Sequence, residues 1–277
     1  MEILRTVEAF RAWRGEQRGD LGLVPTMGYL HEGHLSLVRA ARQQNERVAV
    51  SIFVNPTQFG PSEDLASYPR DEARDLQLLE REGVDVVFAP SPEEMYPKGF
   101  CTYVAVEGLT ARLEGASRPG HFRGVTTVVL KLLNIVQPRR AYFGRKDAQQ
   151  LAVVRRMVRD LDVPVEIIGM PIVSEEDGLA MSSRNVYLSP DERRAAPVLN
   201  RSLRLAEGLY ASGERDADAI RGRMSALIAG QQLTTVDYIS VADAESLDEL
   251  ARVDRPTLVS LAVRFGSTRL IDNTTLG

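Results

Sequence analysis

The sequence predicts an α/β protein in which a doubly wound parallel sheet is followed by a smaller α+β domain. Two observations carry this prediction. Across residues 20–170, short apolar runs alternate with stretches whose apolar residues recur at helical spacing, as in strands joined by helices. After residue 185 the pattern changes to helices rich in Arg, Ala and Glu, followed by strands with little sequence between them. The predicted domains cover residues 1–180 and residues 181–277.

The strands of the first domain are predicted from apolar runs that are too brief for helices and suit buried strands. They lie at residues 21–24, 48–54, 84–89, 141–143 and 165–170. Apolar residues at helical spacing predict the helices between them. These helices cover residues 37–43, a segment after Pro69, residues 125–136 and residues 151–158. Residues 91–120 are irregular, with one alternating stretch at 103–106.

The second domain begins with two predicted helices within residues 190–230, joined near Gly213. Three strands follow, at residues 236–241, 257–265 and 269–272. Because so few residues separate these strands, we expect them to be antiparallel.

The composition excludes several classes of protein. A net charge of -4 gives no reason to expect nucleic acid or a membrane surface as a partner. The longest apolar run, near residues 48–54, is too short to span a bilayer, and the N-terminus lacks the apolar region of a signal peptide. The one cysteine, Cys101, allows no internal disulfide and fits a reducing compartment. We therefore expect a cytoplasmic protein.

The rest of the chain is organised around residues 24–34, which read VPTMGYLHEGH. They join the first buried run to the first amphipathic helix, so they form a strand-to-helix turn. Gly28 and Gly33 allow main-chain N–H groups to approach a ligand, and the helix start adds partial positive charge. His31 and His34 lie at this helix start, where imidazole N–H groups can donate to phosphate oxygens. The turn is predicted to hold phosphate.

Two other interpretations of the histidine pair remain open. His31 and His34 could cap the helix without binding a ligand. They could also form half of a metal site, with His121 as a third ligand from a distant loop, although no cysteine cluster accompanies them. The chain has three histidines, and two of them lie in this one turn, which favours the phosphate site.

Four later segments accompany the turn. They read SIFVNPTQFGPSEDLASYPRD, RPGHFRGVTTVVLKLLNIVQP, YFGRKDAQQL and DGLAMSSRNVYLS. In their order and separations, over residues 24–190, these segments and the turn closely resemble the pantothenate synthetase family. This family belongs to the HxGH nucleotidyltransferases, as do the class I aminoacyl-tRNA synthetases. The later LIDN, at residues 270–273, is compatible with the small C-terminal domain of the family.

The resemblance implies a Rossmann-like catalytic domain that binds ATP and pantoate, a small C-terminal lid domain, and a two-step ligation. The carboxylate of pantoate attacks the α-phosphorus of ATP, giving pantoyl adenylate and pyrophosphate. The amine of β-alanine then displaces AMP and gives pantothenate. Such steps need positioning and charge neutralisation more than a protein nucleophile. Mg²⁺ is expected with ATP, although the sequence names no protein ligand for it. A homodimer is also implied.

The resemblance also implies site residues by position. Pantoate would be bound by Gln58 and Gln150. The catalytic residues would be His31, His34, Lys146, Ser182, Ser183 and Arg184. The residues of the ATP site would be Met27, Gly28, Tyr29, Leu30, His31, Glu32, Gly33, His34, Gly144, Arg145, Lys146, Asp147, Val173, Met181, Ser182, Ser183 and Arg184.

Each of these residues also has a structural interpretation. Lys146 could be a solvated surface charge, the serines could cap a helix, and the glutamines could be ordinary surface residues. His121 could contact substrates or support its loop. The chain departs from the family's usual GEKDYQQ at two positions, with Arg145 in place of the acid and Ala148 in place of the aromatic residue. We expect Arg145 to face solvent or an acidic neighbour, and Ala148 to alter local packing.

Three alternative functions remain open, two of them enzymes and one without catalysis. Another HxGH nucleotidyltransferase could join a nucleotide to a phosphate ester. A class I tRNA synthetase would need an anticodon-binding module and a lysine-rich signature, where this chain has MSSRN. A nucleotide-binding regulatory module would lack catalysis. Such modules typically lose their charged catalytic residues, and here Lys146 and Arg184 are present together with the histidine pair.

Overall fold

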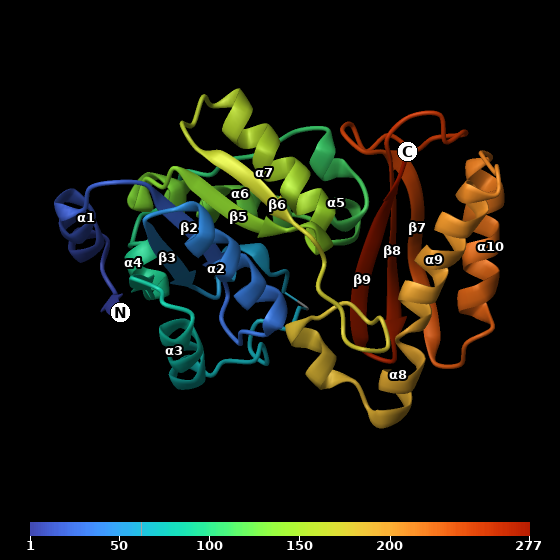
Figure 1. Cartoon of the computed structure of the whole chain (residues 1–277), viewed down its shortest axis with the longest axis horizontal. Coiled ribbons are helices and arrows are strands. Elements are labelled where there is room, and N and C mark those ends of the chain that lie inside the picture. The colour runs from blue at the N-terminus through green and yellow to red at the C-terminus, as the bar shows by residue number, and fades with distance from the viewer. Residues whose placement is uncertain (62) are drawn as a thin grey trace. The chain divides into compact units, whose positions relative to one another are not determined.

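The computed structural model describes residues 1–61 and 63–277 and divides the chain into two compact units (Figure 1). Unit 1 comprises residues 1–145 and 150–171, and unit 2 comprises residues 146–149 and 172–277. A short piece of chain flanked on both sides by unit 1 thus belongs to unit 2. The predicted domain division at residue 180 stays a prediction.

Unit 1 contains a six-stranded sheet in which every neighbouring pair of strands is parallel. The strand order is β1-β4-β3-β2-β5-β6. The predicted doubly wound parallel sheet is therefore confirmed. The strands are β1 (Glu2–Leu4), β2 (Leu21–Thr26), β3 (Arg47–Ile52), β4 (Val86–Phe88), β5 (Arg140–Gly144) and β6 (Glu166–Met170).

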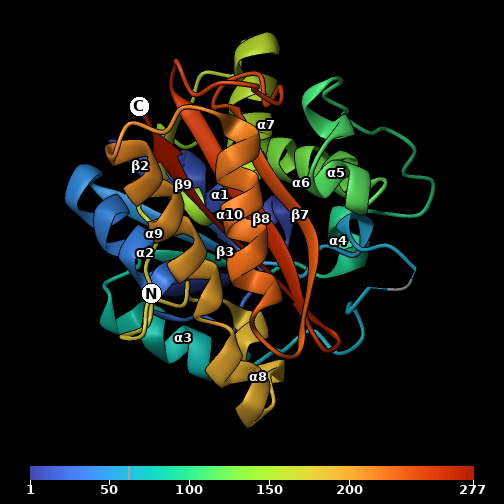
Figure 2. The ribbon, with the colours of Figure 1, turned by 90° about the vertical axis from the view of Figure 1, so that its right-hand side faces the viewer.

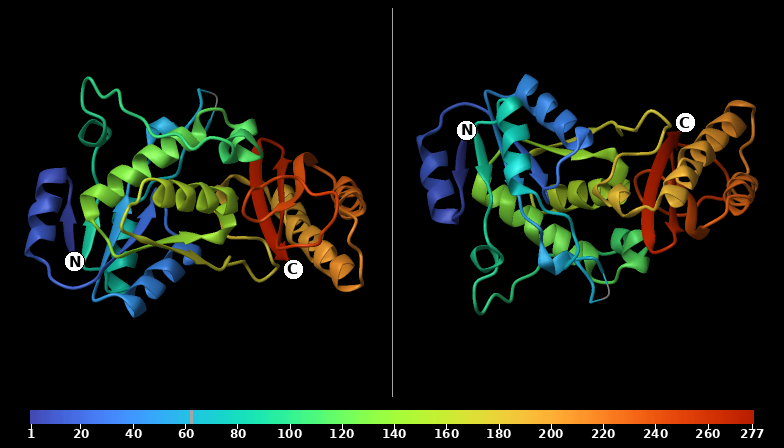
Figure 3. Two further views of the ribbon diagram at one scale, coloured as in Figure 1. Left: turned by 90° about the horizontal axis from the view of Figure 1, so that it is seen from above. Right: turned by 90° about the horizontal axis from the view of Figure 1, so that it is seen from below.

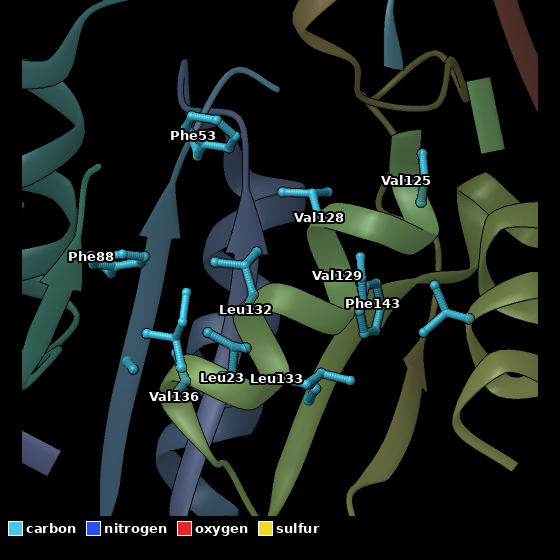
Figure 4. Close-up of a cluster of buried hydrophobic side chains, with 14 of the residues drawn as sticks. Leu23, Phe53, Phe88, Val125, Val128, Val129, Leu132, Leu133, Val136 and Phe143 are labelled. Carbon is cyan, nitrogen blue, oxygen red and sulfur yellow. The ribbon is translucent and has the colours of Figure 1, made fainter. Parts of the chain in front are cut away.

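Helices cover both faces of this sheet, because each side buries its own apolar cluster. On one face α6 directs Val128, Leu132 and Val136 at the strands, where Leu23 and Phe88 meet them (Figure 4). Helices α1 and α7 pack into the same cluster, and α2 and α3 cover the other face. The bounds are α1 (Val7–Glu16), α2 (Glu32–Gln44), α3 (Glu72–Arg81), α4 (Pro92–Met95), α5 (Glu114–Ser117), α6 (His121–Val136) and α7 (Ala148–Asp160), with 3-10 helices η1 (Pro56–Gln58), η2 (Leu109–Ala111) and η3 (Arg145–Asp147).

The strand order places the predicted phosphate turn at the centre of the sheet. From β2, the chain continues by way of β3 toward one edge, whereas β5 pairs with β2 on its other side. Ligands of open parallel sheets bind at the carboxyl ends of strands at such a reversal of order. The segments that leave these two ends begin at Met27 and at Arg145.

Unit 2 contains an antiparallel sheet of three strands, β7 (Thr234–Asp243), β8 (Thr257–Phe265) and β9 (Thr268–Leu276), in the order β7-β8-β9. Helices α9 (Val198–Ala211) and α10 (Ala217–Ala229) pack on one face of it (Figure 2). They are preceded by η4 (Ser183–Tyr187) and α8 (Pro190–Ala195). The predicted smaller α+β unit and its antiparallel strands are confirmed.

The structure corrects the sequence prediction in two places. Residues 190–230 form three helices rather than two, because Pro197 lacks the N–H that would continue α8. The alternating stretch at 103–106 lies in an irregular loop outside the sheet (Figure 3), as the irregular region predicted there implied, and Val104 N–H donates to the Thr127 hydroxyl (3.0 Å). The first strand and helix, β1 and α1, were not predicted, since alternating charges obscure the two buried aromatic residues of α1.

Within residues 1–61 and 63–277, no helix combines the length and the apolar character needed to cross a bilayer.

Candidate active site

The turn after β2 has a tightly determined main chain. Gly28 and Tyr29 have φ angles of 80° and 51°, in the left-handed region that glycine favours. Gly28 N–H donates to the hydroxyl of Thr26 (3.2 Å), which itself donates to the Ser51 carbonyl of β3 (2.8 Å). A side chain at Gly28 would come within 3.0 Å of an Asp75 oxygen. The turn therefore requires glycine at this position.

Asp75 of α3 fixes the same turn by two hydrogen bonds. Its Oδ2 accepts the N–H of Tyr29 (2.7 Å), and its Oδ1 accepts the N–H of Leu30 (2.7 Å). Asp75 is 1% exposed. Burial raises the pKa of its carboxyl group, and the two N–H donors oppose this effect. The left-handed turn is thus fastened to a helix that lies 45 residues later in the chain.

We expect Asp75→Asn to lower the free energy of unfolding by about 1–3 kcal/mol, because an amide oxygen accepts only one of the two N–H groups. The remaining N–H would face the NH₂ group of the new amide, which cannot accept it. Because the turn would then be less well fixed, the KM for ATP should also rise. Chemical denaturation and steady-state kinetics measure these two effects. The control is Glu80→Gln, which removes a charge from the exposed side of α3. Unchanged stability and KM in Asp75→Asn would contradict this role.

The two histidines cap α2. His31 is the N-cap residue, and its Nδ1 accepts the N–H of Gly33 (3.2 Å). His34 reaches back, and its Nδ1 accepts the N–H of His31 (3.4 Å). The ring centroids lie 4.1 Å apart, and both side chains are half-buried. A neutral imidazole that accepts at Nδ1 carries its proton on Nε2. Capping therefore makes both Nε2 atoms donors, and the capping and phosphate-binding interpretations are compatible.

Gln58 lies beside this turn. It ends η1 and is 8% exposed, and its Nε2 donates to the sulfur of Met27 (3.1 Å). The Asn55 amide donates both to Gln58 Oε1 (3.1 Å) and to the Gly124 carbonyl of α6 (3.1 Å). A Cβ at Gly124 would meet the Thr57 carbonyl oxygen at 2.3 Å, so glycine lets α6 approach η1. The structure thus brings together a predicted ATP residue and a predicted pantoate residue.

His121 supports this loop. Its Nδ1 lies 2.8 Å from the Gln58 carbonyl, and its Nε2 lies 3.1 Å from Arg118 Nη1. Arg118 also forms an ion pair with Glu63 (2.6 Å). Burial, followed by the Arg118 charge, lowers the pKa of His121 to about 4. The imidazole is therefore neutral near pH 7, donating to the carbonyl and accepting from Arg118. Of the two roles considered for His121, these contacts match loop support.

The segment after β5 carries the two departures. Gly144 ends the strand, and Arg145 is exposed, with its Nε donating to the Gly169 carbonyl of β6 (3.1 Å). Arg145 also lowers the pKa of Arg155, whose own burial lowers it more. The exposed side chain agrees with the expectation that Arg145 faces solvent. Gln150 is half-buried in the first turn of α7.

Because Arg145 is exposed and its Nε donates to a main-chain carbonyl, we expect Arg145→Glu to change the KM for ATP less than tenfold. A glutamate would gain an attractive interaction with Arg155 and lose one hydrogen bond, two effects that oppose one another. Initial-rate kinetics at varied ATP concentration measure the KM. A larger change would show that the Arg145 side chain contributes substantially to ATP binding.

In unit 2, Lys146 and Asp147 belong to the same compact unit as β9. The carbonyl of Lys146 accepts from Asn273 Nδ2 (2.8 Å). Lys146 is half-buried and Asp147 is exposed. β9 thereby fixes the main chain from which both side chains leave.

A second segment of unit 2 gathers the remaining predicted residues. Met181 N–H donates to the Val173 carbonyl (2.9 Å), so residues 173–181 fold back on themselves. Ser182 then caps η4, accepting the N–H of Arg184 (3.3 Å). Ser183 is buried, and Ser182 and Arg184 are half-buried. Helix capping by Ser182 is therefore present, and it leaves a binding role open.

Both units match known proteins over their whole length. A family model described as pantoate-beta-alanine ligase matches residues 2–275. The chain belongs to the pantoate-β-alanine ligase family. It is 63% identical over 273 residues to a pantothenate synthetase of Roseiflexus castenholzii, an alignment that covers 99% of this chain and 98% of that protein.

Solved structures of the pantoate-β-alanine ligase family agree. Pantothenate synthetase from Thermus thermophilus matches with a TM-score of 0.95 at 52% identity, covering 99% of each chain. A pantoate-β-alanine ligase from Francisella tularensis, crystallised with β-γ ATP and β-alanine, matches with a TM-score of 0.83 at 34% identity, covering 99% of this chain and 97% of that one. The predicted family, fold and enzyme class are therefore confirmed, and the chain is a ligase of pantoate and β-alanine.

Several residues that hold the site were not predicted. Asp75 lies four residues before the buried Leu79 and therefore on the same apolar side of α3. A carboxylate at such a position was a signal of a buried hydrogen-bond acceptor. Asn55 follows the carboxyl end of β3, where ligands bind.

Proposed function

We propose that this ligase consumes ATP in two steps through pantoyl adenylate. A pantoate carboxylate oxygen attacks the α-phosphorus as the bond to pyrophosphate breaks. The deprotonated amine of β-alanine then attacks the acyl carbon, and AMP leaves with the electron pair of the acyl–oxygen bond. The Francisella tularensis relative, crystallised with a form of ATP and with β-alanine, supports this choice of substrates.

The capping geometry of α2 is the observation that carries the proposal. Since His31 and His34 accept main-chain N–H groups at Nδ1, each presents an Nε2–H donor at a helix N-terminus. Two such donors suit phosphate oxygens that gain charge as the α-phosphorus is attacked. His34 would supply a proton or hydrogen bond to the leaving pyrophosphate. The fixed turn of residues 27–30 would cradle the nucleotide with its N–H groups.

Other residues would share the work. Lys146 would offset phosphate charge, with Gly144, Arg145 and Asp147 contributing the neighbouring contacts. Ser182, Ser183 and Arg184 would bind the β- and γ-phosphates, and Met181 and Val173 would line the nucleotide. Gln58 and Gln150 would bind pantoate, whose hydroxyl and carboxylate groups suit amide donors and acceptors. The hydrogen bonds that fix Gln58 from Asn55 and His121 support a preformed pantoate site.

Mg²⁺ would enter as part of the ATP complex, and its charge would neutralise the phosphates when bound. Among the residues that the structure describes, no group of three or more His, Cys, Asp and Glu side chains is arranged to hold a metal ion. Such an ion is often held mainly by phosphate and water oxygens. A homodimer in the cytoplasm completes the proposal.

Exchange of labelled pyrophosphate into ATP tests the proposed first step. We expect exchange to depend on pantoate, and AMP to be released only when β-alanine is added. Exchange that ignores pantoate would favour a different HxGH nucleotidyltransferase. Absence of exchange, with ATP binding retained, would favour a regulatory module.

A further inference from the structure

The predicted phosphate segment of unit 2 is fastened at both of its ends. Ahead of it, the Met181 N–H donates to the Val173 carbonyl (2.9 Å). Behind it, the side chain of Asn185 turns back, and its Nδ2 donates to Glu175 Oε1 (2.9 Å) and to the Ala180 carbonyl (3.3 Å). The residues between these contacts are the two serines and the arginine proposed to bind the β- and γ-phosphates.

The orientation of the Asn185 amide leaves one of its atoms unsatisfied. Both partners of Nδ2 are acceptors, so the amide nitrogen must face them and Oδ1 points elsewhere. Oδ1 is buried, and it finds no hydrogen-bond donor in the part of the chain that the structure describes. A buried acceptor without a donor costs at least as much as a typical intramolecular hydrogen bond contributes. The net contribution of this side chain to stability is therefore small, and its placement needs another reason.

Glu175 links Asn185 to helix α8. Its second oxygen, Oε2, accepts from Arg193 Nη2 (2.6 Å), and Arg193 Nη1 donates to Asp177 Oδ2 (2.5 Å). The side chains of Arg193 and Glu175 are 31% and 33% exposed. Ion pairs so accessible to water contribute little to stability. What Glu175 supplies is geometry, because one carboxylate joins the hydrogen bond of Asn185 to a helix.

The turn that carries Glu175 is held independently of this carboxylate. Leu179 is 1% exposed and packs in the apolar cluster of unit 2. Its carbonyl accepts the N–H of Glu175 (2.8 Å), which closes the turn. Gly178 has a φ of 90°, and a Cβ there would meet Asn200 Oδ1 at 2.7 Å, so glycine lets the turn lie against α9. Removal of the Glu175 side chain should therefore leave the turn folded.

We propose that Glu175 and Asn185 are positioning residues for residues 182–184. The turn and α8 fix Glu175, and Glu175 holds the Asn185 side chain, which restricts the neighbouring Arg184 before ATP binds. Fixing a binding group in advance reduces the entropy that is lost when the ligand arrives. The inference rests on the proposed contact of residues 182–184 with the β- and γ-phosphates, and it adds a carboxylate that acts through the segment.

The two steps of the reaction provide a readout that a general loss of structure would not reproduce. Adenylate formation starts from ATP and uses contacts with the β- and γ-phosphates. Pantoyl adenylate has lost both of these phosphates, so its reaction with β-alanine does not use those contacts. A misplaced segment should therefore slow the first step alone, whereas a damaged fold would slow both.

The test is to assay the two steps separately in Asn185→Ala and Glu175→Ala. We expect single-turnover adenylation to slow at least about tenfold in each, with the reaction of supplied pantoyl adenylate with β-alanine within about twofold of the parent protein. Tm should change by less than about 3 °C, because exposed ion pairs contribute little to stability. Glu175→Gln should recover most of the rate, since its Oε1 can still accept from Asn185. Glu176→Ala, which removes the exposed neighbouring carboxylate, is the control and should change neither step.

Two outcomes would overturn the positioning role directly. Equal slowing of both steps would mean that these contacts only maintain the fold. Adenylation by Glu175→Gln as slow as that of Glu175→Ala would mean that the charge, and not the hydrogen bond to Asn185, is required. The double alanine variant should be no slower than the slower single variant, because both changes remove the same hydrogen bond. If Asn185→Ala does not fold, the two Glu175 variants still decide.

Arg184→Ala separates this inference from the proposed function. Slow adenylation by Arg184→Ala, combined with parent-like adenylation by the Glu175 and Asn185 variants, would overturn the positioning role alone. Normal adenylation by Arg184→Ala would overturn the proposed phosphate contact of this segment as well.

Discussion

His34→Ala is expected to slow pantoate-dependent adenylation at least about a hundredfold, the usual result of removing one donor that stabilises developing charge. Its Nδ1 accepts the His31 N–H, so its Nε2 carries the proton that would meet the pyrophosphate leaving group. Single-turnover formation of adenylate from ATP and pantoate measures the step directly. Near-normal rates would remove His34 from the mechanism.

Because His34 is also part of a cap, alanine alone cannot separate catalysis from folding. His34→Gln is the matched variant, since glutamine at this third helical position can accept the N-cap N–H in a capping box. His34→Ala should lower the free energy of unfolding by about 0.5–2 kcal/mol, with a matching fall in Tm. We expect His34→Gln to recover this stability while adenylation stays slow. If glutamine also restored the rate, the histidine would be only a cap.

Lys146→Ala should slow the same step at least about a hundredfold, because the variant would have nothing in place of the positive charge lost at the phosphates. The fold should survive, since the contact that holds this segment runs from Asn273 to the main-chain carbonyl of Lys146. Tm and single-turnover adenylation are the measurements. Lys98→Ala, which removes an exposed lysine of unit 1, is the control and should leave both unchanged. A rate within tenfold of the parent protein would exclude Lys146 from charge neutralisation.

The sequence was most informative where local chemistry determines structure. The buried runs and helical stripes of residues 20–170 predicted the parallel sheet, because the period of apolar residues reports which side of an element is buried. The turn before α2 was also predicted, because its glycines and histidines make their contacts within a few positions of one another. Its capping contacts span two or three residues.

What could not be predicted depends on partners far apart in the chain. Asp75 holds Tyr29 across 46 positions, and nothing local to α3 identifies which N–H groups its carboxylate accepts. The bond from Asn273 to Lys146 spans even more of the chain. β1 was missed because a three-residue strand carries too little pattern, and it is defined by its pairing with β4.

Residues 146–149 belong to unit 2, whereas the residues on both sides of them belong to unit 1, so the chain changes unit three times. A C-terminal fragment that begins at Ile172 would lack the carbonyl to which Asn273 donates. Expressed by itself, such a fragment would leave the Asn273 amide of β9 without this acceptor. No boundary drawn at a single position in the chain therefore both separates the units and keeps Asn273 with the carbonyl that it contacts.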